Sequence, residues 1–82
     1  MMFEKTIYLD GVDPLEFYGA NNSKIDLIRS YFPKLKVVAR GDIVKARGSE
    51  EETLRFEGKM EELAEQYHKF NLLPEKVIIQ IL

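Results

Sequence analysis

The pattern of apolar and polar residues near the N-terminus predicts a strand followed by a short helix. Residues 4–9 are rich in β-branched and aromatic side chains and lead into an Asp-Gly turn, which is typical of a short strand. Asp13 directly precedes Pro14, and this order is that of a helix N-cap followed by the first helical residue. A helix is therefore expected over residues 14–18, and Gly19 is expected to end it.

A second helix is expected after a brief loop. Apolar residues recur at spacings of three and four between Ile25 and Phe32, which is the period of one helix face. Either Asn22 or Ser23 can cap its first turn, so the sequence leaves the starting residue open. Pro33 ends the helix, because proline lacks the amide hydrogen that a further turn needs.

The period changes to two at residue 35, which predicts a β-hairpin. Residues 35–40 and 43–47 each alternate between apolar and polar positions, and Gly41-Asp42 between them suits a tight turn. Successive side chains of a strand point to opposite faces. One face of the first strand therefore carries Leu35, Val37 and Ala39, and the other carries Lys36, Val38 and Arg40.

A long amphipathic helix is expected to begin at Glu50. Ser49 followed by three glutamates is a capping box, and the acidic first turn also complements the helix dipole. Gly58 lies on the expected exposed side and weakens the helix without breaking it. The apolar positions expected to face the core are Phe56, Met60, Leu63, Ala64, Tyr67 and Phe70.

The segment after Pro74 has two possible structures. Its proline start favours a helix, whereas the run Val77-Ile78-Ile79 is also compatible with a strand, and we favour the helix. We expect residues 1–73 to form one domain and residues 74–82 to begin a C-terminal helix or a linker. Because the sequence ends on two apolar residues, we also expect it to be a fragment of a longer protein.

The predicted order is strand, helix, helix, strand, strand, helix, which places the chain in the α+β class. This order resembles the KH domain, a two-layer sandwich with a three-stranded sheet and helices packed on one face. In KH domains a Gly-x-x-Gly loop between the first two helices clamps a nucleic-acid backbone. The corresponding residues here are Gly19-Ala20-Asn21-Asn22, so asparagine replaces the second glycine and fills space beside the expected clamp.

Composition limits the classes of protein that are possible. Eighty-two residues are enough for one core, and 45% hydrophobic residues argue against intrinsic disorder. The absence of cysteine excludes disulfides, thiol catalysis and thiolate metal sites. The N-terminal residues lack the apolar run of a signal peptide, and no stretch is long enough to span a membrane. We therefore expect a cytoplasmic location.

The net charge of −2 hides a separation of charge along the chain. Residues 1–18 carry a net charge of −3 and residues 49–82 a net charge of −4, both from an excess of Asp and Glu. Residues 19–48 hold seven Lys or Arg and two Asp, a net charge of +5. A basic middle of this kind creates a local positive field that attracts phosphates.

Most of the chain also resembles the N-terminal region of the PhoH-like, phosphate-starvation-inducible ATPases of bacteria. The resemblance runs from about Tyr8 to the C-terminus. It rests on the Gly-x-Asn-Asn loop that begins at Gly19, on the Phe-Pro-Lys-Leu-Lys-Val-Val-Ala-Arg-Gly-Asp segment of residues 32–42, and on Gly48 before the acidic helix start.

The resemblance implies a KH-like accessory domain beside an ATPase domain of the P-loop class, with RNA-linked roles. This chain has no Gly-x-x-x-x-Gly-Lys-Ser/Thr motif, so the ATP and magnesium implied for the family belong to an ATPase domain that is absent here. The implied partners are single-stranded RNA, the protein's own ATPase domain and a second copy of the chain, and no membrane is implied.

The candidate nucleic-acid-binding residues come from the loop and the basic middle. We expect Lys24, Arg29, Lys36 and Arg40 to converge on a groove between the loop, the second helix and the following strand. A simpler interpretation is that these cations only cover a solvated surface and that the asparagines are turn and cap residues. The full candidate set is Gly19, Ala20, Asn21, Asn22, Ser23, Lys24, Arg29, Lys36, Arg40, Lys45 and Arg47.

Catalytic and metal-binding residues are not expected. His68 stands without a second histidine or a paired acid at ligand spacing, so we predict no metal site. The glutamates of the long helix are expected to form an exposed face and not an acid-base pair. Two functions are favoured: weak binding of single-stranded RNA, and a protein-interaction module that docks on the ATPase domain or self-associates through the apolar tail, residues 77–82. Small-ligand binding is a third class, and no motif in the sequence supports it.

Overall fold

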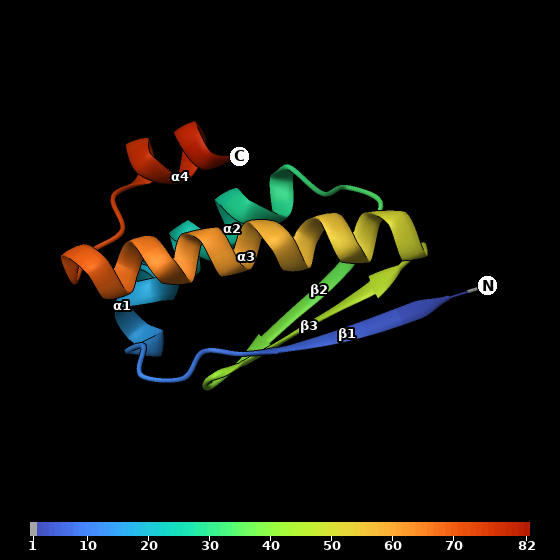
Figure 1. The fold of residues 1–82 in the computed structure, drawn as a ribbon, viewed down its shortest axis with the longest axis horizontal. Helices are drawn as coiled ribbons and strands as arrows, with labels where there is room; N and C mark the ends of the chain where they lie inside the picture. Colours follow the sequence, from blue (N-terminus) through green and yellow to red (C-terminus); the bar gives the residue numbers. More distant parts are fainter. Residues whose placement is uncertain (1) are drawn as a thin grey trace.

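The computed structural model describes residues 2–82 and confirms the α+β class, with a three-stranded antiparallel sheet and helices (Figure 1). The predicted helix for the last segment is also confirmed. A short 3₁₀ turn, η1, occupies the loop between the first two helices. The elements are β1 (Phe3–Tyr8), α1 (Pro14–Tyr18), η1 (Ala20–Asn22), α2 (Ser23–Ser30), β2 (Lys36–Arg40), β3 (Ile43–Gly48), α3 (Glu50–Phe70) and α4 (Glu75–Ile81).

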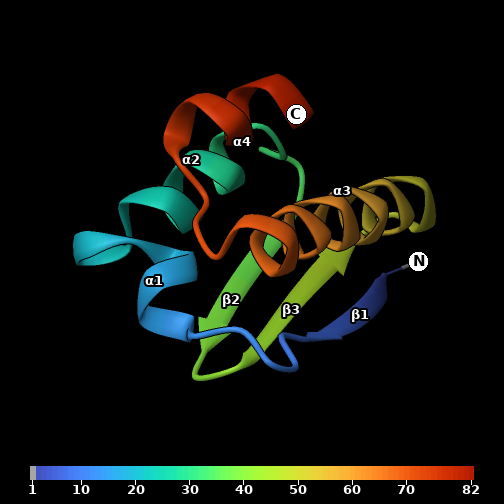
Figure 2. The same ribbon diagram turned by 60° about the vertical axis from the view of Figure 1, so that its left-hand side comes forward.

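The strands lie in the order β1-β3-β2, so β3 occupies the centre of the sheet. β3 pairs with β2 through the predicted hairpin, and it pairs with β1 over the whole length of that strand. Helices α1, α2 and α3 lie on one side of the sheet in both views (Figures 1 and 2). The sheet therefore has a covered face and an uncovered one.

The register assigns each strand residue to one of these faces. Ile7, Val37 and Val44 are buried beneath the helices, so their neighbours along each strand point the other way. We call this second surface the open face. It consists of Glu4, Thr6 and Tyr8 from β1, Ile43, Lys45 and Arg47 from β3, and Lys36, Val38 and Arg40 from β2.

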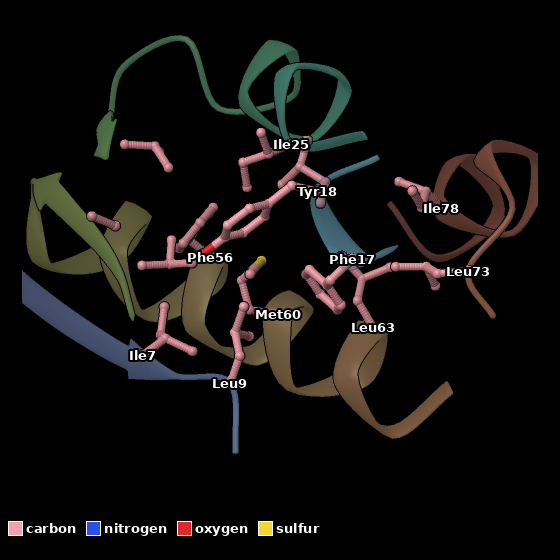
Figure 3. Close-up of a cluster of buried hydrophobic side chains, with 14 of the residues drawn as sticks. Ile7, Leu9, Phe17, Tyr18, Ile25, Phe56, Met60, Leu63, Leu73 and Ile78 are labelled. Carbon is pink, nitrogen blue, oxygen red and sulfur yellow. The ribbon is translucent and has the colours of Figure 1, made fainter. Parts of the chain in front are cut away.

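The long helix α3 supplies much of the core (Figure 3). Phe56, Met60, Leu63 and Tyr67 are buried as their spacing predicts, and Ser49 Oγ accepts a hydrogen bond from the Glu52 amide at 3.2 Å, as expected for an N-cap. The prediction that Phe70, the last of the expected core positions, is buried is wrong.

Phe70 is 56% exposed. It lies in the final turn of α3, beyond the part of the helix that covers the sheet (Figure 1). Helical spacing alone therefore placed Phe70 in the core, together with Ala64, which is only partly buried.

The segment after Pro74 packs against the rest of the chain. Helix α4 contacts α2 and α3, and Ile78 and Leu73 are completely buried (Figure 3). The Lys59 ammonium also donates a hydrogen bond to the carbonyl of Ile81 at 3.0 Å. Residues 74–82, expected as the start of a helix or linker, thus share a core with residues 3–73.

A buried tyrosine links α1 to the hairpin. The Tyr18 hydroxyl donates a hydrogen bond to the Gly41 carbonyl at 2.7 Å. Burial raises the pKa of Tyr18 above its ordinary value of 10.0, and the nearby charge of Asp42 raises it further. Above about pH 10 Tyr18 therefore holds its proton more firmly in the folded protein than in the unfolded chain, so its contribution to the free energy of unfolding falls as pH rises.

We expect Tyr18→Phe to lower the free energy of unfolding by about 0.5–1.5 kcal/mol near neutral pH, because the Gly41 carbonyl loses its partner. The advantage of the wild type should shrink when the pH rises from about 8 to about 11. Urea denaturation of both proteins at several pH values measures this difference. An advantage that stays constant or grows with pH would contradict the role given to the hydroxyl.

Candidate nucleic-acid interface

The loop between α1 and α2 is open to solvent. Its first residue, Gly19, ends α1, and its amide donates to the Leu15 carbonyl at 3.0 Å. Asn21 and Asn22 both adopt left-handed backbone angles, with φ of 54° and 62°. Residues 20–23 are exposed, so α4 does not cover the turn.

The loop geometry requires glycine at its first position. Gly19 has φ 81° and ψ 169°, a region that is essentially restricted to glycine. A Cβ atom at Gly19 would lie 2.8 Å from Lys24 Cγ and 3.1 Å from the Lys24 amide nitrogen. Asn22 is the N-cap residue of α2, but its side chain makes no capping hydrogen bond. Glycine at position 19 is therefore explained by structure alone, without a ligand.

Gly19→Ala is expected to lower the free energy of unfolding by about 1–3 kcal/mol, because alanine must adopt this strained backbone conformation. Gly58→Ala is the matched control, since a Cβ at Gly58 meets nothing within 4 Å. The control should stabilise α3 by about 0.8–1 kcal/mol. Urea denaturation measures both values. Equal effects of the two substitutions would show that the turn tolerates a side chain.

The surroundings of the loop carry mixed charge. Lys24 Nζ donates to the Glu16 carbonyl at 3.3 Å. A depression beside the loop also includes two carboxylates, since it is lined by Asp13, Leu15, Glu16, Gly19, Ala20 and Lys24. The positive charge of Lys24 is thus opposed locally by two acids, which weakens its attraction for phosphate.

Arg29 is held by contacts within the protein. Its Nε donates to the Val37 carbonyl on β2 at 3.1 Å, and its Nη1 donates to Asp26 Oδ1 at 2.6 Å. Arg29 therefore connects α2 to the outer edge of the sheet. Its charge is partly neutralised by Asp26, so it is a weaker candidate for a phosphate contact than the sequence indicated.

The expected convergence of Lys24, Arg29, Lys36 and Arg40 on one groove is not found. Lys24 and Arg29 belong to α2, on the covered side of the sheet (Figure 2). Lys36 and Arg40 flank the buried Val37 and the half-buried Ala39 along β2, so they project from the open face. The physical reason is that the apolar face of β2 packs beneath the helices, which turns its cations away from them.

The structure instead gathers four candidate residues on the open face. Lys36 and Arg47 are direct cross-strand neighbours, and Lys45 lies opposite Val38. Arg40 completes the group at the hairpin end of β2. All four are exposed, and within residues 2–82 none of them forms an ion pair. Glu4, opposite Arg47, is the acid that the open face contributes.

Sequence reasoning placed Val38 beside Lys36 and Arg40, but it overlooked the other apolar residues of the open face, Tyr8 and Ile43. Tyr8 lies directly opposite Ile43, with 63% of its surface exposed, and Val38 is also exposed. The signal was the alternation within residues 4–9, where the exposed tyrosine follows the buried Ile7. It could be interpreted only once the pairing of β1 with β3 was known.

The part of the chain that the structure describes contains neither a metal-binding group nor a membrane-spanning helix. No group of three or more His, Asp or Glu side chains between residues 2 and 82 is placed to hold a metal ion. None of the helices in that range is long and apolar enough to cross a membrane. The sequence matches no protein-family model, no curated protein and no solved structure.

Proposed function

We propose that this chain is a non-catalytic, KH-like accessory domain of a PhoH-like P-loop ATPase, and that it binds single-stranded RNA weakly. The observation that carries the RNA proposal is the group of four cations on the open face, Lys36, Arg40, Lys45 and Arg47. They are exposed and unpaired within residues 2–82 although the molecule is anionic overall. Four cations beside a single acid, Glu4, attract a polyanion, because binding releases the counterions of its phosphates.

The KH-like and PhoH-like parts of the proposal rest on other support. The KH-like part is supported by the succession of strands and helices from β1 to α3 and by the exposed loop that begins with Gly19 and joins α1 to α2. The sequence resemblance over residues 32–42 supports the link to the PhoH-like family. ATP and magnesium would be bound by the separate ATPase domain and not by this chain.

Titration of the ¹⁵N-labelled chain with a short oligouridylate tests RNA binding. We expect salt-sensitive shifts of backbone amide signals, with a dissociation constant on the order of 10⁻⁴–10⁻⁶ M near physiological salt. Affinity should rise as salt is lowered. If no amide signal moves even at low salt, the chain does not bind RNA and the proposal fails.

A second candidate function is docking on the ATPase domain or on another copy of the chain. It is favoured by an apolar surface where α3 meets α4, lined by Gln66, Phe70, Leu72, Pro74 and Val77. Phe70 and Leu72 are each at least half exposed there. Sedimentation at increasing concentration tests self-association, and mixing with a separately expressed ATPase domain tests docking. A chain that stays monomeric and does not bind that domain would exclude this function.

A further inference from the structure

We infer that single-stranded nucleic acid binds across the open face of the sheet, with its phosphates on the cations and its bases against Tyr8, Ile43 and Val38. This inference rests on the proposed RNA binding and assigns it to a surface on the opposite side of the sheet from the loop at Gly19. It follows from the arrangement of charged and apolar side chains in the strand register.

The open face has three cross-strand rows. The first row holds Glu4, Arg47 and Lys36, and the second holds Thr6, Lys45 and Val38. The third row holds Tyr8, Ile43 and Arg40. Directly opposite side chains in such rows lie about 5 Å apart, so each row forms a continuous surface. Cations thus occur in every row, and none of them is surrounded by acids.

The spacing along β2 suits an extended polyanion. Lys36 and Arg40 are four residues apart on the same face, which corresponds to roughly 13 Å along a strand. Val38 lies between them and places an apolar side chain between two positive charges. A chain of alternating phosphates and flat bases can contact both kinds of side chain at once.

The apolar third row indicates which polyanion fits. Tyr8 is exposed, and its direct cross-strand neighbour is the partly buried Ile43. An exposed aromatic ring beside cations is the usual platform on which an unpaired base stacks. A duplex cannot offer its base faces to such a ring, and the Asp and Glu side chains of an acidic peptide carry no aromatic group. The arrangement therefore favours a single-stranded nucleic acid.

The cationic part of the inference is tested with two double variants of equal charge change. Lys36→Gln with Lys45→Gln removes two charges from the open face, whereas Lys69→Gln with Lys76→Gln removes two exposed charges from α3 and α4. Binding of a labelled oligouridylate of about eight nucleotides is followed by fluorescence anisotropy at several salt concentrations.

The open-face double variant should bind more weakly, and its slope of log affinity against log salt should be shallower by about 1.4, from about 0.7 per lost phosphate contact. The control double variant should keep the wild-type slope. Amide signals of residues 36–40 and 43–47 should move more than those of residues 19–24. Circular dichroism establishes that all variants are folded.

The stacking part of the inference is tested at Tyr8. Tyr8→Leu should weaken binding by about 5- to 150-fold, the equivalent of one lost base stack. Tyr8→Phe keeps the ring and should keep the affinity. Polyglutamate of similar length serves as a competitor without bases, and it should compete poorly with the oligouridylate.

The outcomes separate the inference from the function on which it rests. If the wild type binds RNA but both double variants weaken equally, or if only residues 19–24 respond, the open face is not the site although RNA binding stands. If polyglutamate competes equally and Tyr8→Leu binds normally, the surface accepts polyanions without stacking, and the inference is overturned. If the wild type binds no RNA at low salt, the proposed function and the inference both fail.

Discussion

Replacing Phe56 by alanine is expected to lower the free energy of unfolding by about 3–5 kcal/mol. Phe56 is completely buried in the N-terminal half of α3, and its ring packs edge-on against Phe32 with a centroid separation of 5.1 Å. The Arg55 guanidinium lies 4.8 Å from the centroid of the same Phe32 ring. Removing Phe56 thus opens a cavity where α3 meets the segment that follows α2. Urea denaturation monitored by far-ultraviolet circular dichroism measures the loss.

Leu54→Ala is the control for this prediction. Leu54 lies two residues away on the same helix with 49% of its surface exposed, so its replacement should change stability by no more than about 0.5 kcal/mol. Natural domains are stable by only about 5–15 kcal/mol, and the loss at Phe56 is a large part of that range. Similar small effects at both positions would show that the core is not packed around Phe56.

Ile78→Ala is expected to lower the free energy of unfolding by about 2–5 kcal/mol, because its side chain is completely buried between α4 and the rest of the core. The adjacent Ile79 is 51% exposed on the same helix. Ile79→Ala should therefore have an effect of no more than about 0.5 kcal/mol. Thermal or urea denaturation of the two variants makes the comparison.

This pair of variants also determines whether α4 belongs to the domain. A large loss at Ile78 and a small one at Ile79 means that residues 74–82 contribute to the cooperative core. If both substitutions are nearly neutral, α4 is only loosely attached, and residues 74–82 act as a linker. Amide hydrogen exchange in α4 provides an independent measurement of the same property.

The secondary structure was largely predictable because its signals are local. Asp13 with Pro14 set the start of α1, and Ser49 set the start of α3, since a cap acts within one helical turn. The change of period at residue 35 marked the hairpin. The 3₁₀ turn of residues 20–22 was missed, because it depends on two successive asparagines in left-handed conformations.

The candidate site was predicted less well than the fold. The alternation along β2 already placed Lys36 and Arg40 opposite the apolar Val37. The groove prediction did not take into account that the helices must cover the apolar face of that strand. The cations consequently lie on the other side of the sheet from Lys24 and Arg29. Which face a strand residue occupies is local information, but which face the helices cover depends on packing across the whole chain.

The pairing of β1 with β3 could not be deduced from local patterns. Residues 4–9 and 43–47 are far apart in sequence, and either edge of the hairpin could have accepted a third strand. The pairing brings Tyr8 beside Ile43 and places Glu4 beside Arg47. The aromatic and acidic components of the open face are therefore set by tertiary structure, and the sequence alone did not reveal them.

The contact between Arg29 and the Val37 carbonyl has a consequence for solubility. β2 is an outer strand, and outer strands can extend a sheet by joining with a strand from a neighbouring molecule. Arg29 occupies the Val37 carbonyl, which is one of the backbone acceptors that an added strand would use. The positive charges of Lys36 and Arg40 also make two copies of β2 repel each other. Loss of Arg29 would thus favour aggregation through this strand at high protein concentration.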